Sequence, residues 1–266
     1  MLLTPELAEA IRRAEIAGIR CGLDTARRLR PDTGVAGVEI AGGLAAFFGP
    51  ESPVSEAFGV GTSAPVTAAE IAAITEFYES RASTARVFVS PLAHPTLGVG
   101  LAAAGYAPAE YENVLASGTF EPYARRDDRL RAAADLHAWA RASAAAFLDG
   151  GAVTPEDEHL ALTIAASDGV TAVEGIEDGS IVATGAMDVR GDCAALFAAS
   201  TMPGFRGRGW HLALIADRIA RARDAGARFL RATARPGSVS ERNFHRCGFT
   251  TLYTRLLWER KRDTNF

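Results

Sequence analysis

The chain has 266 residues, of which 48% are hydrophobic and 23% are charged, and its formal net charge is −4. This length allows one large or two ordinary globular domains, and the weak negative charge excludes a general basic surface for nucleic acid or for an anionic membrane. The three cysteines, Cys21, Cys193 and Cys247, lie far apart and lack Cys-x-x-Cys spacing, which favours reduced thiols in a cytoplasm over a disulfide framework or a metal site.

Helices and strands alternate along the first half of the chain. Thr4, Pro5 and Glu6 are typical of a helix start, and a helix is predicted from there to about Arg28. Charged residues interrupt its apolar positions, which excludes a signal peptide or a membrane span in this segment. Strands are predicted at 37–49, 55–61, 85–91 and 111–117, an amphipathic helix at 67–81, and a shorter helix before Tyr106.

A polar, turn-rich segment at 118–130 predicts a domain boundary, which gives domains 1–120 and 121–266. Beyond it, two helices are predicted at 133–148 and 154–167. Three strands follow between 171 and 201, joined by hairpin turns at Asp178-Gly179 and Gly191-Asp192. The remaining elements are a helix from 210 to about 225, a strand within 227–238, a short helix within 240–249 and a strand at 250–260.

The two halves share one order of elements. Residues 85–106 match residues 227–249 to within one residue between an Ala-Arg pair and a Gly-aromatic pair. This indicates a duplication with a period of about 140 residues, and chance similarity between alanine-rich segments is the alternative. The predicted fold class is α/β (α+β), with a central mixed, mostly antiparallel sheet flanked by helices.

The stretch PGFRGRGWHLALI, residues 203–215, places glycines and arginines at the start of a predicted helix. The first backbone N–H groups of a helix lack internal partners and attract anions. Gly207 and Gly209 let the backbone approach a phosphate closely, and Arg206 and Arg208 add positive charge. The stretch therefore predicts a phosphate site; a glycine-rich turn with solvated arginines is the alternative.

Two other phosphate motifs fail at named positions. A Walker loop needs a lysine followed by serine or threonine after its glycines, and the stretch has none. A dinucleotide fingerprint needs a third glycine where Leu212 stands, and an acid after the next strand, which reads ARFLRATARPG. A nucleotide-binding oxidoreductase is therefore disfavoured.

The stretch resembles the acyl-CoA-binding motif of the GNAT superfamily (GCN5-related N-acetyltransferases). That motif reads Arg/Gln-x-x-Gly-x-Gly/Ala with a proline three residues before it, matched here by Pro203, Arg206 and Gly209. It departs at His211, where the family has a small residue. The segment SVSERNFHRCGF, residues 238–249, resembles the second family motif, so the resemblance covers roughly residues 130–260.

The resemblance implies a GNAT fold, acetyl-CoA as the cofactor, and N-acetyltransferase activity of the acyltransferase class. It also implies that the strand ALFAAST separates from the neighbouring strand RFLRATA to admit the pantetheine arm. The expected cofactor-binding residues are Ala199, Ser200, Thr201, Met202, Arg206, Gly207, Arg208, Gly209, Trp210, His211, Ser238, Asn243 and Phe244. Ser238 and Asn243 have an alternative role in capping or solvating their helix.

The implied reaction is attack of a neutral amine on the acetyl thioester, which requires positioning, a proton route and stabilisation of the acyl oxygen. The family's tyrosine that protonates the thiolate corresponds to Phe244, which carries no proton. Tyr253, His245 and Glu174 are the candidate catalytic residues, and Asp188 and His137 are further candidate bases. The expected acceptor is a small-molecule or peptide amine. A non-catalytic acyl-CoA binder or sensor is the alternative.

The matching junction in the first half, FGVGTSAPVTAAEIA, lacks the Arg-Gly-x-Gly motif. Thr67 and Glu70 instead form a predicted capping box, which satisfies the free N–H groups and places a carboxylate at the positive helix end. We therefore expect the first half to be a degenerate copy that does not bind CoA. It would support the catalytic half, line the acceptor site, or form a homodimer contact; an unrelated domain is the alternative.

Overall fold

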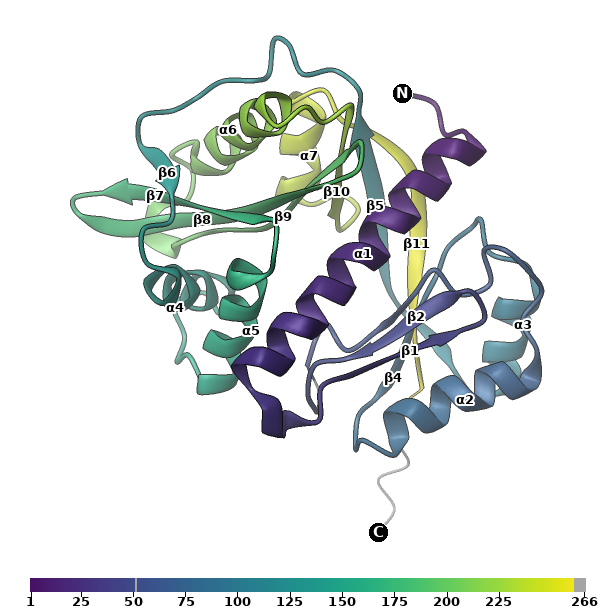
Figure 1. The fold of residues 1–266 in the computed structure, drawn as a ribbon. Helices are drawn as coiled ribbons and strands as arrows, with labels where there is room; N and C mark the ends of the chain where they lie inside the picture. Colours follow the sequence, from purple (N-terminus) through teal and green to yellow (C-terminus); the bar gives the residue numbers. More distant parts are fainter. Residues whose placement is uncertain (51, 261–266) are drawn as a thin grey trace. The chain divides into compact units, whose positions relative to one another are not determined.

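A computed structural model describes residues 1–50 and 52–260 of the chain (Figure 1). These residues form two compact units. Unit 1 comprises Met1–Ala14 and Val114–Leu252, and unit 2 comprises Glu15–Asn113 and the chain from Tyr253 onward. The strands hydrogen-bond in the order β1-β2-β3-β4-β11-β5-β10-β9-β8-β7-β6. The predicted α+β class, with a mixed sheet flanked by helices, is confirmed.

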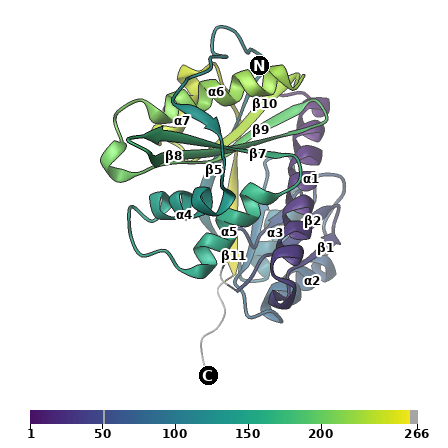
Figure 2. The ribbon, with the colours of Figure 1, turned by 60° about the vertical axis from the view of Figure 1, so that its left-hand side comes forward.

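Unit 1 is built on strands β6 (Leu130–Ala132), β7 (Val170–Glu177), β8 (Ser180–Arg190), β9 (Cys193–Thr201) and β10 (Phe229–Ala234). Neighbours pair antiparallel from β6 to β9, and β10 pairs parallel with β9. Helices α6 (Trp210–Asp224) and α7 (Val239–Arg246) cover one face, and α4 (Leu136–Phe147) and α5 (Pro155–Ala166) cover the other (Figures 1 and 2). The turns at Asp178-Gly179 and Gly191-Asp192 join β7, β8 and β9 as predicted.

Close packing of α6 on the sheet depends on a glycine. A Cβ at Gly175 would lie 2.8 Å from the ring of Trp210, which is itself 2% exposed. Because successive residues of a strand face opposite sides, Glu174 on β7 faces α4 and α5 instead. The indole of Trp139 on that side donates a hydrogen bond to the Val173 carbonyl at 2.9 Å.

Unit 2 has two apolar cores on the two faces of its strands. Its strands are β1 (Ala36–Ile40), β2 (Gly43–Phe47), β3 (Ala57–Phe58) and β4 (Ala85–Val89), together with parts of β5 (Ala107–Ser117) and β11 (Thr250–Arg260). Its helices are the part of α1 (Pro5–Leu29) from Glu15 onward, α2 (Ala68–Glu79) and α3 (Thr96–Ala103), with a 3₁₀ turn, η1, at Pro31–Thr33. Leu44 and Ala46 of β2 pack with Ile16 and Leu23 of α1. The alternate residues, Ala45 and Phe47, share a core with α2 and α3.

The single strand predicted at 37–49 is a hairpin of β1 and β2. Ala41 and Gly42 form its turn with φ angles of 51° and 74°. Two successive residues at positive φ reverse the chain with the twist that a tight hairpin requires. The Ala-Gly-Gly sequence at 41–43 is typical of such a turn. The prediction of one strand was wrong because it treated the apolar residues on both sides of this sequence as a single segment.

The compact units differ from the predicted continuous halves 1–120 and 121–266. Val114–Ser117, the end of β5, belongs to unit 1, although it precedes the predicted boundary. In unit 2, β11 pairs antiparallel with β4, with Leu256 opposite Val89. Each half thus ends in a strand whose hydrogen-bond partners come from far along the sequence, which composition and turn signals do not reveal.

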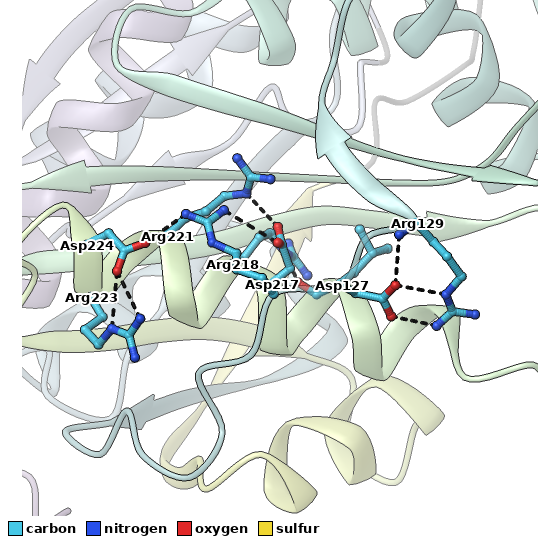
Figure 3. A network of polar contacts seen from close by, with 9 residues as sticks. Asp127, Arg129, Asp217, Arg218, Arg221, Arg223 and Asp224 are labelled. Atoms are coloured by element: carbon cyan, nitrogen blue, oxygen red, sulfur yellow. Dashed lines mark hydrogen bonds and ion pairs between the residues drawn. The ribbon is translucent and has the colours of Figure 1, made fainter.

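The polar segment predicted as a linker is attached to α6 by ion pairs and a backbone hydrogen bond. Arg126 lies 2.9 Å from Asp224 and 3.6 Å from Asp217, and the Arg125 N–H donates to the Ala216 carbonyl at 3.2 Å. On α6, Arg221 donates to Asp217 at 2.6 Å (Figure 3). The segment therefore belongs to the folded structure of unit 1.

Candidate active site

The start of α6 is an open helix N-terminus. Its N-cap is Gly209, which adopts a φ of 81°. Because glycine has no side chain, the first N–H groups of the helix are not capped by this residue. Gly207 also has a positive φ, 77°, and at neither glycine would a Cβ meet another atom within 4 Å. The backbone donors are therefore accessible to an anion, and the helix dipole favours one there.

The two arginines of the loop already have carboxylate partners. Arg206 donates to the carboxylate of Asp149 at 2.6 Å and to the carbonyls of Thr201 and Ala146 at 3.1 and 3.2 Å. Arg208 donates to Glu177 at 2.8 Å. Both side chains are about half exposed (50% and 53%), so these ion pairs are weak and an incoming phosphate would compete for the guanidinium groups.

Strand β9 separates from β10 before it reaches α6. Their parallel register runs from Cys193–Phe229 to Leu196–Ala232 and includes no later pair, although β9 continues to Thr201. The predicted separation of ALFAAST from RFLRATA is thus confirmed. From Phe197 onward the backbone of β9 is not paired with β10, so its N–H and C=O groups on that side are not used by the β9–β10 ladder.

A β-bulge lies at the same point on the other side of β9. Thr184 pairs with Ser200 and Ala186 pairs with Phe197, so Gly185 on β8 faces the two residues Ala198 and Ala199. Ala198 has a positive φ of 48°. A β-bulge increases the local twist and redirects the backbone. It therefore changes the direction of β9 just where β10 pairing ends.

Of the expected cofactor residues at the end of β9, Ser200, Thr201 and Met202 have hydrogen-bond partners within the protein. The Ser200 hydroxyl hydrogen-bonds to the Thr184 hydroxyl at 2.7 Å and is buried. Ala199 has no polar side chain, and the Thr201 carbonyl accepts from Arg206. The Met202 N–H donates to the Val182 carbonyl at 2.9 Å.

His211 belongs to a partly buried chain of hydrogen bonds. Arg246 donates to the Asn243 amide oxygen at 3.1 Å, and the Asn243 amide nitrogen lies 3.1 Å from His211 Nδ1. Because guanidinium and amide N–H groups only donate, His211 Nδ1 accepts and the ring carries its proton on Nε2. Burial, with a further contribution from the charge of Arg218, lowers the pKa of His211 to about 4, so the imidazole is neutral at pH 7.

Three further expected cofactor residues have structural partners. The Ser238 hydroxyl caps α7 by accepting from the Glu241 N–H at 3.1 Å. Phe244 is 3% exposed and packs edge-on against Phe249 with ring centres 5.0 Å apart. Trp210 is buried in the core of unit 1. Ser238 thus has the capping role that the sequence left open, and Phe244 is a core residue.

The three catalytic candidates lie on three different elements, β7, α7 and β11. Glu174 on β7 is 2% exposed and lies 2.8 Å from Arg131. His245 on α7 bonds the Phe249 carbonyl at 3.0 Å, at the end of its own helix. Tyr253 lies on β11 in unit 2.

The two further candidate bases also have partners. Asp188 is buried beside Arg190 at 3.0 Å, and His137 is exposed 3.9 Å from Glu158. None of the five candidates is linked to another by a described hydrogen bond, so no acid–base pair is evident in the described residues.

Sequence reasoning missed Arg218, which is the buried cation nearest the bulge. It is 0% exposed and donates to the carbonyls of Ala186 and Phe197, both at 2.9 Å. The signal was present, because Arg218 lies four and three residues after Leu214 and Ile215, on the apolar stripe of α6. A buried guanidinium needs hydrogen-bond acceptors, so an arginine on the apolar face of a helix predicts polar partners in the sheet on which that face packs.

Two absences can be stated for the described chain, residues 1–50 and 52–260. No set of three or more His, Cys, Asp or Glu side chains is grouped there as a metal site. None of the helices in these ranges combines the length and apolar character needed to cross a bilayer.

Solved structures share this fold at low sequence identity. A GCN5-related N-acetyltransferase from Kribbella flavida has a TM-score of 0.64 at 18% identity, over 93% of this chain and 95% of that chain. An acetyltransferase of the GNAT family from Colwellia psychrerythraea has a TM-score of 0.52 at 14% identity, over 84% and 83% of the two chains. A tandem GNAT protein from the clavulanic acid biosynthesis pathway has a TM-score of 0.51 at 12% identity, over 72% and 68%.

At these identities the likeness shows the fold alone. No curated protein matches the chain in sequence. Residues 122–249 do match the sequence model of the Acetyltransferase (GNAT) family, and they contain the open start of α6, the bulged β9 and the separation of β9 from β10. This part of the chain is therefore similar in sequence to the GNAT acetyltransferase family.

Proposed function

We propose that the protein is an acetyl-CoA-dependent N-acetyltransferase that acts on a small-molecule or peptide amine. The observation that carries this proposal is the uncapped N-terminus of α6, which follows strand β9 at the end where β9 no longer pairs with β10, after Leu196. The first feature provides donors for a diphosphate, and the second provides free backbone groups for an extended amide-containing arm. The family match over residues 122–249 supports it.

The residues of unit 1 fit CoA at two points. The α6 N–H groups behind Gly207 and Gly209 would hold the diphosphate, with Arg206 and Arg208 released from Asp149 and Glu177. The backbone of Phe197–Thr201 would hydrogen-bond the pantetheine arm. When bound, acetyl-CoA supplies the acetyl group as a thioester, which an amine can attack directly.

Proton transfer is the weakest part of the fit. Phe244 has no proton to donate and is buried in the core. A thiol has a pKa near 8.5, so a thiolate can leave without an acid at neutral pH. We infer that the chain contributes mainly positioning and electrostatic stabilisation, which are large terms in acyl transfer.

Titration calorimetry tests the cofactor proposal. We expect acetyl-CoA and CoA to bind and NAD to give no signal. Reversal of both loop charges (Arg206→Glu with Arg208→Glu) should weaken CoA binding at least about tenfold, since two phosphate-facing cations are lost. Arg223→Glu, at the far end of α6, is the control and should bind CoA like the wild type. Unchanged affinity in the double variant would contradict the proposed phosphate site.

The buried Phe244 favours a second candidate, a non-catalytic acyl-CoA sensor. Thiol release from acetyl-CoA across a panel of amines separates the two functions. Release that depends on one amine class supports the transferase. Binding without release for every amine supports the sensor.

We also infer that unit 2 derives from a duplicated copy that no longer binds CoA. A strand pair, a third strand, a helix, a strand, a short helix and a last strand follow one another in both halves. Both hydrogen bonds of the predicted capping box at the start of α2 are present, with Glu70 2.8 Å from the Thr67 N–H. The His94 N–H also donates to the Gly61 carbonyl at 2.7 Å, where a CoA arm would need room.

The acceptor role of this copy, a homodimer contact and a cytoplasmic location remain proposals. The location rests on three cysteines that are all free thiols. Neither nucleic acid nor membrane is an expected partner, because the charge pattern provides no basic surface for either.

A further inference from the structure

Arg218 is an unusual residue to find beneath the central sheet of unit 1. It is fully buried, and its Nη2 atom has no hydrogen-bond partner in the described chain. Its neighbour Asp217 opposes the lowering of the Arg218 pKa through its charge, but no hydrogen bond joins the two side chains in the described residues; that carboxylate is bonded to Arg221 at 2.6 Å and lies 3.6 Å from Arg126. A buried cation without its own carboxylate is costly, so a fold keeps one where it has a use.

The three hydrogen bonds that Arg218 does make connect α6 to both strands beside the bulge. Nε donates to the Leu214 carbonyl at 3.0 Å, within the helix. Nη1 donates to the carbonyls of Ala186 on β8 and Phe197 on β9, each at 2.9 Å. Ala186 and Phe197 form the last regular pair before the bulge, so one guanidinium nitrogen connects both strands at the point where the ladder is interrupted.

Gly185 makes this arrangement sterically feasible. It is the β8 residue opposite the bulged Ala198 and Ala199. A Cβ at Gly185 would lie 3.2 Å from the guanidinium carbon and 3.3 Å from Nε and Nη1 of Arg218. The sheet therefore leaves room for the guanidinium directly under the bulge.

Phe197 is also the first residue of β9 beyond the last pair with β10, Leu196–Ala232. The Phe197 carbonyl accepts a hydrogen bond from Arg218. The same residue begins the part of β9 that is unpaired with β10, which is proposed to bind the thioester arm. Arg218 lies eight residues after Trp210, about 12 Å along the helix axis from the donors of the diphosphate site. Its influence is thus expected at the acyl end of the cofactor and not at the phosphate end.

We propose that Arg218 is a positioning residue for acyl transfer: it holds the bulged backbone of β9 and places a buried positive charge beside the acyl oxygen. This inference rests on the proposed CoA site. Burial lowers the pKa of Arg218 to about 10, so the charge persists at neutral pH. A cation held in a dry environment stabilises negative charge that develops on the acyl oxygen more strongly than one in water does.

The test compares the affinities of two ligands in variants of the full chain. In Arg218→Met we expect acetyl-CoA to bind about tenfold more weakly, while CoA, which shares the pantetheine arm but has no acyl oxygen, loses clearly less affinity. Thiol release in the presence of an active amine should fall by about 10²-fold, as for a misplaced or missing stabilising group. Arg218→Lys keeps the charge and should lie between the wild type and Arg218→Met.

A second variant and a control keep the test decisive if Arg218→Met does not fold. Gly185→Ala displaces the guanidinium without removing its charge, so it should lower the affinity for acetyl-CoA selectively. Arg221→Met perturbs the same helix without touching β8 or β9, and should leave the ratio of the two affinities unchanged. Hydrogen exchange of the amides at 197–201 should accelerate in Arg218→Met and Gly185→Ala but not in Arg221→Met.

Equal loss of acetyl-CoA and CoA binding in the Arg218 variants, or the same selective loss in Arg221→Met, would overturn the inference. Unchanged exchange at 197–201 would overturn it as well. If the wild-type protein bound neither ligand, the proposed function would fail instead, and the role of Arg218 with it.

Discussion

At the scale of single residues, burial and neighbouring charges shift the pKa values of ionisable side chains such as His211 and Glu56. His211 stands where the family resemblance calls for a small residue, and its ring is fixed by Asn243 and Arg246. The ring faces Phe244 edge-on, with centres 5.9 Å apart. The resulting imidazole is neutral and can donate a hydrogen bond through Nε2–H near the start of α6. Its Nδ1 atom already accepts a hydrogen bond from Asn243, so it is not available to act as a base.

The lowered pKa of His211 predicts an acid-dependent loss of stability. The unfolded chain takes up a proton near pH 6.5, whereas the folded chain resists protonation until about pH 4. The stabilisation is therefore complete above pH 6.5 and is lost as the pH falls toward 4, by up to about 3 kcal/mol. Denaturant unfolding at several pH values should show a steeper acid loss in the wild type than in His211→Gln. His137→Gln, at an exposed imidazole, is the control and should retain the wild-type slope.

Glu56 in unit 2 shows the opposite dependence. It is 8% exposed with no hydrogen bond or ion pair from its carboxyl group to the described residues. Arg255 nearby is occupied by Glu15 at 2.9 Å and Glu112 at 2.6 Å. Burial and the negative charge of Glu112 raise the pKa of Glu56 to about 8, although Arg255 and Arg86 oppose the shift.

A raised carboxyl pKa means that the folded chain holds a proton that the unfolded chain releases above about pH 4.5. Stability from this group is full below pH 4.5 and is lost as the pH rises to 8. We therefore expect Glu56→Gln to be more stable than the wild type by about 2 kcal/mol at pH 8, with a smaller difference at pH 5. Chemical unfolding at both values checks this. Glu76→Gln, an exposed glutamate on α2, should show no such gain.

At the scale of elements, the helix at the candidate site, α6, differs from α2 and α5 in how its N-terminus is capped. The starts of α2 and α5 are closed by capping boxes, Thr67 with Glu70 and Thr154 with Asp157. The start of α6 has only Gly209. A closed start stabilises its helix, and an open start leaves donors for a ligand.

This contrast predicts different effects of two alanine substitutions in one loop. Gly209→Ala forces a side chain into the left-handed region at φ 81°, which costs about 1–2 kcal/mol. Its methyl group also enters the open space before α6, so CoA affinity should fall about tenfold. Gly204→Ala is the matched control, since neither a positive φ nor a close atom opposes it. Melting temperatures and calorimetric titration with CoA measure both effects; equal behaviour of the two variants would contradict the contrast.

At the scale of the whole molecule, the strands and the sequence divide the chain differently. Unit 1 needs Val114–Ser117 of β5 and Met1–Ala14, whereas unit 2 needs β11 from Tyr253 onward. A cut between residues 120 and 121 leaves each fragment without strand residues that the same unit uses. The exposed edges would be free to aggregate.

We therefore expect neither fragment 1–120 nor fragment 121–266 to unfold cooperatively when produced alone. Co-expression of the two fragments should restore cooperative melting and acetyl-CoA binding, because the missing strands are then supplied in trans. Circular dichroism melting and calorimetry measure these outcomes. A fragment 121–266 that melts cooperatively and binds acetyl-CoA like the full chain would contradict this division.

The sequence by itself determined most elements and the start of the candidate site. Caps at Thr4 and Thr154, hairpin turns at Asp178-Gly179 and Gly191-Asp192, and the glycines before α6 act within a few residues, so local patterns suffice to predict them. The tertiary structure decided which strands became neighbours, that β5 contributes to both units, and that Arg218 lies under the bulge of β9. These outcomes depend on hydrogen bonds and burial between residues far apart, such as Arg255 with Glu15, 240 positions away. Pairing of that kind is selected by the packing of the whole chain, and no short pattern in the sequence records it.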